Sequence, residues 1–375
     1  MTLSFGGFLP PFHEPGEDPH NIYWRDLGLV EWLEELGFDE AWVGEHHSAG
    51  WAPISSPELF MAAAAERTHR IKLGTGVVSL PYHNPLTVAN RIVQLDHQSR
   101  GRVLFGMGAG VLPSDAYMMG ISPVDQRRMM TESLDAIMHL FHSDEPLTRK
   151  TDWFNLQEAR LHLRPYNPDG LPMVVASSGS TRSMELVGRY GLSPLTFATG
   201  MPGAGAPPLG ELWQAAEASA VEHGQTVDRK GWRVVISAHV AESREEALND
   251  VRAGVGRWIN GYFRDTIGLP IKLPEGREVE AMVASGSAIV GTVEDAIAAI
   301  EKLEEISGGF GTVLFTAQDW APREKLRRSY ELIARYVVPH FRGSVRSLKA
   351  SQEWVAGKSA DFAAMNAEAR RQSTD

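Results

Sequence analysis

Strand-like and helix-like runs alternate along the whole chain, and this alternation constrains the fold more than any other feature of the sequence. The pattern is typical of a parallel sheet whose strands are joined by crossover helices. A chain of 375 residues could form one large barrel or two smaller domains, so length does not decide between them. Because eight such units follow one another without a break in composition, they favour a single (β/α)8 TIM barrel over two doubly wound domains. The expected strands are residues 3–9, 40–44, 71–78, 103–107, 173–176, 194–198, 232–240 and 312–316.

Helical patterns fill the spaces between these strands, and three further segments depart from the repeat. Residues 144–172 are predicted to form a small inserted hairpin. Residues 256–290 form the longest connection without obvious periodicity, and we treat them as a candidate lid, since such connections are usually lids or disordered. Residues 344–375 are either an amphipathic arm or a frayed end. The barrel domain is therefore expected to span residues 1–343, followed by a C-terminal tail.

Composition excludes several classes of function. The formal net charge of −11 argues against a nucleic-acid partner, and no apolar run approaches the ~18 residues of a membrane span. The N-terminus lacks a basic start and meets Pro10-Pro11 before an export signal could form, so we expect a cytoplasmic protein. Cysteine is absent, which removes disulfides, thiolate nucleophiles and thiolate metal ligands. Any catalysis must therefore use histidine, carboxylates or a cofactor.

Three ionisable side chains, Glu45, His46 and His47, follow the second expected strand directly. Successive strand side chains point to opposite faces, so Glu45 and His47 should share one face and His46 the other. Only one histidine can then face the barrel mouth. The alternative is that one imidazole caps the strand and the other is a solvated loop residue. A zinc site is not expected, because adjacent histidines diverge, unlike the pair in H-E-x-x-H.

The ends of strands two to five reach the same mouth of a barrel, so four separate segments should converge there. One of these segments, residues 177–181, is rich in hydroxyl groups and is expected to begin a helix. The unpaired backbone N–H groups at the start of that helix would hold an anion such as phosphate. The alternative is that the serines are an ordinary helix N-cap. Glycines at 106, 108 and 110 would admit a flat ligand or allow close chain packing, but their spacing departs from G-x-G-x-x-G. A G-x-S-x-G hydrolase elbow does not occur. The segments expected at the mouth contain His46, Gly76, Val77, Gly108, Ala109, Ser177, Ser178, Gly179 and Thr181.

Several blocks of sequence together resemble the bacterial-luciferase-like flavin monooxygenases. The resemblance runs from the first strand to about residue 340, and the N-terminal third, with SAGW at 48–51 and PSDAY at 113–117, is most similar to the limonene-monooxygenase-like branch. The other blocks are FDEAWVGEHH at 38–47, LGTGVVSLPYHNP at 73–85, LD at 95–96 with GR at 101–102 and Gly106, VVASS at 174–178 and GTVED at 291–295.

The resemblance implies an enzyme that uses FMNH2 from a separate flavin reductase, together with O2, to oxygenate a small apolar substrate, terpene-like or a ketone, through a flavin peroxide. It implies that His46 lies beside the reacting flavin as a base or hydrogen-bond donor. It further implies a non-prolyl cis peptide at Gly76-Val77 beneath the flavin ring, and an FMN phosphate cradle that includes Ser177, Ser178 and Thr181. This chain departs from luciferase itself at two places. It has Ser177 where luciferase has an acidic residue, and it has Gly108-Ala109 where luciferase has a Cys-Arg pair. The second departure weakens the expectation of aldehyde chemistry and of an arginine clamp there.

A dry pocket is needed for such chemistry. The candidate lid, residues 256–290, and five aromatic residues could supply it, with an ordinary core or surface position as the alternative for each aromatic: Trp51, Tyr82, Tyr117, Tyr262 and Phe263. A homodimer is expected from the small side chains of residues 62–65 and from family habit. Two other functions stay open. One is a deazaflavin (F420)-dependent oxidoreductase on the same barrel, and the other is a non-catalytic flavin-binding subunit.

Overall fold

The computed structural model describes residues 2–10, 12–199, 206–269, 271 and 273–373. Within this part of the chain, eight parallel strands close into a barrel, because β9 pairs with β10 as well as with β8. The predicted fold is therefore confirmed. The bounds of the barrel strands differ by at most one residue from the expected ones, except that β3 ends three residues early and residues 78–79 form the separate strand β4. The barrel strands are β1 (Ser4–Leu9), β2 (Glu40–Val43), β3 (Lys72–Thr75), β5 (Val103–Gly108), β8 (Met173–Ser177), β9 (Ser193–Phe197), β10 (Arg233–Val240) and β12 (Thr312–Thr316).

Helices cover the outside of the barrel and bury their apolar faces against the strands. Several begin at local signals in the sequence: Asn84 accepts the N–H of Leu86 at the start of α3, where Pro85 needs no hydrogen-bond partner. Thr292 and Asp295 form a capping box at the start of α10. The helices around the barrel are α1 (Pro19–Glu35), α2 (Pro57–Arg67), α3 (Pro85–Ser99), α4 (Pro113–Met118), α5 (Gln126–His142), α6 (Thr181–Tyr190), α7 (Leu209–Glu222), α8 (Arg244–Arg257), α9 (Glu278–Ala284), α10 (Val293–Ser307), α11 (Arg323–Leu332) and α12 (Val338–Arg342).

A buried ion pair lies inside the barrel together with apolar side chains. Arg233 on β10 donates to both carboxylate oxygens of Glu40 on β2, at 2.9 Å each, and the indole of Trp42 donates to the same carboxylate at 2.8 Å. Phe8 and Leu314 pack in the apolar cluster above, with Trp42. The paired donors compensate the cost of burying the carboxylate, and the packed interior closes the barrel as a core rather than a channel.

The two inserted segments differ in how far the sequence predicted them. Residues 144–172 contain the expected hairpin, formed by β6 (Leu147–Lys150) and β7 (Asn155–Ala159). Residues 256–290 have more regular structure than expected, namely the π-helix η3 (Trp258–Thr266), then α9 and the strand β11 (Ala288–Gly291), while residues 270 and 272 lie outside the described part. The buried side chains at 258, 259, 262 and 263 recur at helical spacing, a signal that the later Gly and Pro obscure.

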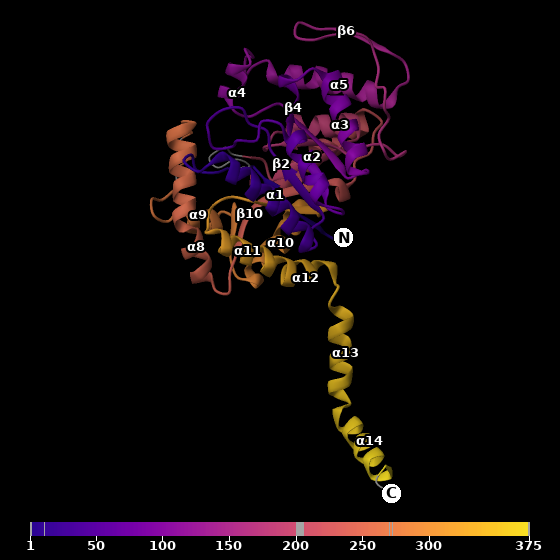
Figure 1. Cartoon of the computed structure of the whole chain (residues 1–375), viewed down its shortest axis with the longest axis vertical. Helices are drawn as coiled ribbons and strands as arrows, with labels where there is room; N and C mark the ends of the chain where they lie inside the picture. The colour runs from indigo at the N-terminus through magenta and orange to yellow at the C-terminus, as the bar shows by residue number, and fades with distance from the viewer. Residues whose placement is uncertain (1, 11, 200–205, 270, 272, 374–375) are drawn as a thin grey trace.

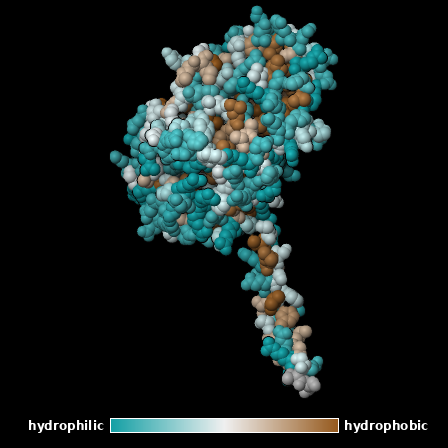
Figure 2. All heavy atoms as spheres, viewed as in Figure 1, coloured by the Kyte–Doolittle hydropathy of each residue, from teal (hydrophilic) through white to brown (hydrophobic). Residues whose placement is uncertain are grey.

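The C-terminal tail forms two helices, α13 (Arg346–Gly357) and α14 (Ser359–Gln372), that extend away from the barrel as an arm (Figure 1). Neither helix has a buried residue. Leu348, Trp354 and Met365 are exposed large apolar side chains of the arm. Brown atoms along the arm in Figure 2 mark hydrophobic residues on its surface. Residues 344–375 were expected to be either an amphipathic arm or a frayed end, and residues 346–372 of the structure form a helical arm. Within the described residues no helix is long and apolar enough to cross a membrane.

Candidate active site

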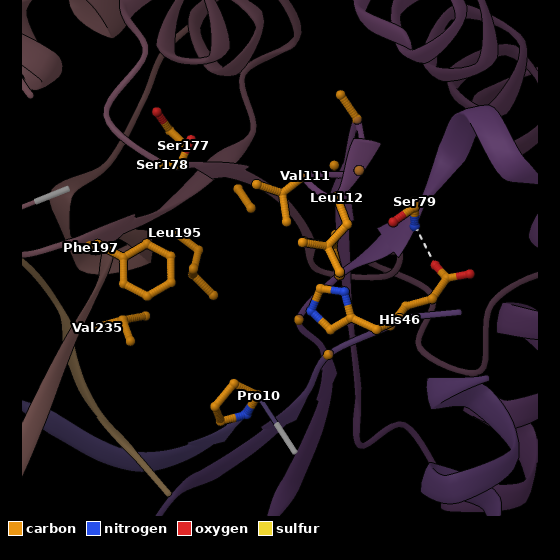
Figure 3. Close-up of a pocket in the computed structure, with 18 of the residues that line it drawn as sticks. Pro10, His46, Ser79, Val111, Leu112, Ser177, Ser178, Leu195, Phe197 and Val235 are labelled. Atoms are coloured by element: carbon orange, nitrogen blue, oxygen red, sulfur yellow. Dashed lines mark hydrogen bonds between the residues drawn. The ribbon is translucent and has the colours of Figure 1, made fainter. Parts of the chain in front are cut away.

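A cavity of about 1080 Å³ lies at the carboxyl ends of the barrel strands. Figure 3 shows His46 on one side of the open space and Ser177 and Ser178 on the other. The predicted convergence of separate segments at one mouth is therefore seen in the structure. Of the predicted mouth residues, His46, Gly76, Val77, Gly108, Ala109, Ser177 and Ser178 line the cavity, whereas Gly179 and Thr181 are not among its lining residues.

His46 points its imidazole into the cavity (Figure 3). The ring packs against Phe12, with 6.0 Å between ring centroids and 25° between planes. Its Nδ1 atom is buried and has no hydrogen-bond partner among the described residues, and it lies 3.5 Å from Oδ2 of Asp115. The other ring nitrogen faces the open space in Figure 3. His46 is therefore placed to exchange a proton with a molecule in the cavity.

Glu45 and His47 contact each other at the strand end, as the alternation predicts, and Glu45 also lines the cavity, whereas His47 is not among its lining residues. One carboxylate oxygen of Glu45 contacts Nε2 of His47 at 2.8 Å and Nε2 of His83 at 2.6 Å. The other accepts the backbone N–H of Ser79 at 2.5 Å. Burial works to raise the pKa of Glu45, but the bonds from both histidines outweigh it and lower that pKa, while the bond to Glu45 raises the pKa of His47. The carboxylate is therefore ionised at neutral pH.

Among the described residues, Glu45, His47 and His83 form the one group that could hold a metal ion, because one ligand atom from each lies within 4.8 Å of the others. Both imidazoles direct Nε2 at the same carboxylate oxygen, at hydrogen-bonding distance. Hydrogen bonding alone accounts for this arrangement.

The glycines of the mouth allow close packing of the chain. The peptide bond between Gly76 and Val77 is cis, as the resemblance implied. A Cβ atom added at Gly76 would meet the ring of Phe8 at 2.7 Å, and one added at Gly108 would meet the side chain of Val77 at 2.8 Å. Close packing of the chain is therefore enough to explain these glycines. Both also line the cavity, so they leave room for a flat ligand as well.

The opposite end of the cavity carries hydroxyl groups and arginines. The Oγ atom of Ser177 accepts the backbone N–H of Ser180 at 3.0 Å and so shapes the turn before α6. Ser180 is the N-cap residue of α6, but its side chain makes no capping bond and instead accepts a hydrogen bond from Arg127 at 3.1 Å. Arg127 and Arg182 both line the cavity. This end therefore combines positive charge, hydroxyls and the N-terminus of a helix, which suits an anionic group.

Two of the five predicted pocket aromatics, Tyr262 and Phe263, line the cavity. The other three do not, and the expectation is corrected for them. Trp51 packs against Tyr262 behind the wall and donates its indole N–H to Thr266 at 3.0 Å. Tyr82 accepts from Gln126 at 3.0 Å, outside the lining. Tyr117 is 84% exposed on α4. Loop and short-helix side chains have no fixed period, so their direction could not be inferred from sequence.

Apolar side chains from the candidate lid form one wall of the cavity instead. Trp258, Tyr262 and Phe263 come from η3 and Met282 comes from α9, and all four are buried. Tyr262 lies 4.5 Å, ring centroid to centroid, from the Phe12 ring that packs on His46. Residues 256–290 therefore cover the histidine side of the site with apolar surface.

Three residues of the site were missed as individual candidates. Asp115 appeared only within a block of resemblance, and Arg127 lies on a helix far along the chain from the serine turn. Gln318 follows β12, lines the cavity and has a buried Oε1 atom without a partner among the described residues. The position of Gln318 after a barrel strand was a usable signal, because residues there face the mouth.

Comparison with known proteins agrees with this geometry. The sequence model described as luciferase-like monooxygenase matches residues 3–308. The chain is 52% identical over 358 residues to 4-hydroxyprotoasukamycin monooxygenase of Streptomyces nodosus subsp. asukaensis, covering 94% of this chain and 96% of that protein. It is 46% identical over 343 residues to limonene 1,2-monooxygenase of Rhodococcus erythropolis, covering 92% and 88%.

Among solved structures, the fold is similar to that of monooxygenase RslO1 from Streptomyces bottropensis, with a TM-score of 0.79 and 23% identity over 90% of this chain and 100% of that one. At that identity the likeness concerns the fold alone. The family model covers most of the chain, and two relatives above 30% identity are both monooxygenases over nearly their full length. The chain therefore belongs to the luciferase-like monooxygenase family and is accordingly a monooxygenase.

Proposed function

We propose that this protein is the oxygenase component of a two-component system, which takes FMNH2 from a separate flavin reductase and uses O2 to oxygenate a small apolar substrate, terpene-like or a ketone. The observation that carries the proposal is the two-ended cavity, with His46 on one side and the hydroxyl and arginine end on the other. The name of one relative, limonene 1,2-monooxygenase, supports a terpene-like substrate.

The residues present fit FMN. The end of the cavity that contains Ser177, Ser178, Arg127 and Arg182 suits an anionic phosphate. The two guanidinium groups supply positive charge there, although this chain has Ala109 where luciferase has an arginine. The cavity, at about 1080 Å³, is at the upper end of the range of ~300–1,000 Å³ that holds drug-sized ligands, so a cofactor and a small substrate fit together. Reduced flavin, when bound, supplies the electrons with which O2 is activated for transfer of one oxygen atom.

The chain's own residues then have two tasks. His46 holds or releases a proton at the ring nitrogen that faces the cavity. The wall of Trp258, Tyr262 and Phe263 excludes water, which would divert the reaction towards release of hydrogen peroxide. Productive oxygenation therefore depends on proton control at His46 inside a largely apolar enclosure.

The test is the coupling of oxygen consumption to product formation in His46→Ala. The variant is expected to bind reduced FMN as the wild type does, but to release hydrogen peroxide in place of most product, because general acid–base catalysis contributes ~10²–10⁴-fold. His142→Ala, at an exposed position on α5, is the matched control and should stay fully coupled. Unchanged coupling in His46→Ala would exclude the role.

A cytoplasmic homodimer is part of the proposal. The small side chains of residues 62–65 offer less surface than expected, because Ala64 and Ala65 are buried and only Ala63 is exposed. The neighbouring Leu59 is 74% exposed and extends the outer face of α2. A monomeric mass in light scattering at micromolar concentration would contradict the dimer.

A further inference from the structure

Asp115 is a buried carboxylate directly behind the histidine of the site. It stands in the first turn of α4, after Pro113, where an acidic residue is favoured by the helix dipole. Its Oδ1 atom accepts the backbone N–H of His47 at 3.1 Å and the hydroxyl of Ser48 at 2.5 Å. Both bonds fix the carboxylate against the loop after β2, and only 1% of the residue is exposed.

The second oxygen of this carboxylate faces the unpartnered nitrogen of the histidine. Oδ2 of Asp115 lies 3.5 Å from Nδ1 of His46, and that nitrogen is buried without a hydrogen-bond partner among the described residues. A buried polar atom without a partner costs ~1–3 kcal/mol, and Oδ2 of Asp115 is the carboxylate oxygen that lies next to this nitrogen. Catalytic hydrogen bonds are often long in a free enzyme and shorten when the ligand binds.

The charge of Asp115 suits this contact. Burial works to raise its pKa, but the nearby imidazole of His46 and the hydrogen bonds from Ser48 and from the backbone N–H of His47 outweigh the burial and lower the pKa. The carboxylate is thus an acceptor at neutral pH. An acceptor on one side of a neutral imidazole requires the proton to be on the facing nitrogen, which leaves the lone pair on the other nitrogen. Here the other nitrogen faces the cavity (Figure 3).

We propose that Asp115 is a positioning residue that holds neutral His46 in the Nδ1–H tautomer, with the Nε2 lone pair directed into the cavity to accept a proton. The catalytic consequence rests on the proposed monooxygenase function, whereas the tautomer is a property of the protein without ligands. The same division of roles exists in Ser-His-Asp enzymes, where replacing the aspartate by asparagine gives the wrong tautomer and a loss of ~10⁴-fold.

The direct test is ¹⁵N NMR of the histidine rings in the full-length protein without ligands, at a pH where His46 is neutral. The signals of His46 are identified among the 13 histidines by their absence in His46→Gln. We expect the Nδ1–H pattern in the wild type and a shift towards Nε2–H in Asp115→Asn. An Nε2–H pattern in the wild type would overturn the proposal without any variant of Asp115 being needed.

Ser48→Ala is the matched control for a purely structural role of Asp115. It removes the hydroxyl bond to Oδ1 and so weakens the tie between α4 and the β2 loop, but it leaves Oδ2 facing His46. The Nδ1–H pattern should persist in Ser48→Ala. Loss of the pattern in both variants to the same extent would assign Asp115 to loop structure alone and would overturn the proposal.

Activity gives the second readout. Asp115→Asn should lower kcat and product coupling at least ~10-fold, within the range of general acid–base contributions, with little change in the KM for substrate. Asp115→Glu should restore part of the coupling. A fully coupled Asp115→Asn would contradict the catalytic consequence. If the wild type itself lacks monooxygenase activity but shows the Nδ1–H pattern, the proposed function fails and the positioning role stands.

Discussion

The carboxylate of Glu45 accepts the backbone N–H of Ser79 at 2.5 Å, and this bond ties the end of β2 to β4 (Val78–Ser79), two residues beyond the cis peptide. The same side chain contacts His47 and His83 through its other oxygen. The network therefore joins two walls of the cavity, one that carries His46 and one that carries Val77, and Glu45 and Ser79 themselves line the cavity.

Replacing Glu45 by glutamine should destabilise the fold. The amide cannot accept from Ser79 and from both imidazoles at once, so at least one buried donor loses its partner, at a cost of ~1–3 kcal/mol. Denaturant unfolding of Glu45→Gln at pH 7 measures this loss of unfolding free energy. Glu353→Gln, on the exposed arm, is the control and should change stability by less than ~0.5 kcal/mol. An equally small effect in Glu45→Gln would contradict the structural role of the network.

Arg127 should contribute to binding of FMN but not of riboflavin, because riboflavin lacks the phosphate. Loss of one charge-assisted hydrogen bond costs ~1.5–3 kcal/mol, so Arg127→Gln should weaken binding of reduced FMN about 10- to 100-fold. Anaerobic titration with each reduced flavin measures the two affinities. Arg346→Gln, exposed on the tail, serves as the control. If Arg127→Gln weakened binding of reduced riboflavin and reduced FMN equally, Arg127 would not act on the phosphate group.

Stability should fall as pH rises from about 6.5 to 9, because of His13. Burial works to lower the pKa of His13, but hydrogen bonds and charges from Asp26 and Asp319 outweigh it and raise the pKa to about 9. The folded state therefore binds a proton that the unfolded state releases, so the stabilisation is complete below pH ~6.5 and is lost as pH passes 9. At ~1.4 kcal/mol per pKa unit it amounts to at most about 3 kcal/mol.

Urea unfolding of the wild type and His13→Asn across this pH range tests the sign and the source. The difference in unfolding free energy between the two proteins should shrink steadily from pH 6 to pH 9.5. His47, whose pKa is also raised, contributes to both proteins in the same way and cancels in the comparison. A difference that stays constant with pH would show that His13 is not the titrating group.

Removal of the arm should leave the barrel intact. Since α13 and α14 bury no residue, a chain ending at Gly343 should unfold within ~0.5 kcal/mol of the full-length protein and keep its affinity for reduced FMN. Denaturant unfolding and flavin titration are the two measurements. A larger loss of stability at micromolar concentration would mean that the arm packs against a second copy.

The barrel was predictable because its strands are short apolar runs between turn signals, and buried parallel strands keep that pattern. Barrel geometry then predicted that His46, Val77 and Ser177 share one mouth, although they are far apart in the chain. Strand alternation further predicted that Glu45 and His47 share one face, and the hydrogen bond between them agrees with this, although Glu45 lines the same cavity as His46.

The rest of the site is formed by loops and helices at the mouth of the barrel, and the sequence of these loops has no hydrophobic periodicity from which the direction of a side chain could be predicted. Asp115 reaches His46 from α4, across nearly seventy positions, and Arg127 reaches Ser180 from α5. Tyr117, two residues after Asp115, points to solvent, so proximity in sequence to a site residue did not predict its direction. Such contacts follow from the packing of loops and short helices, which the local pattern does not encode.

The most direct measurement is an anaerobic titration of the full-length protein with reduced FMN and, separately, with reduced F420, followed by admission of O2 in the presence of a limonene-like alkene. We expect a Kd for reduced FMN in the micromolar range or tighter, much weaker binding of F420, and an oxygenated product that carries one atom from ¹⁸O₂. Tight binding of F420 with no measurable affinity for reduced FMN would contradict the proposed FMNH2-dependent oxygenation.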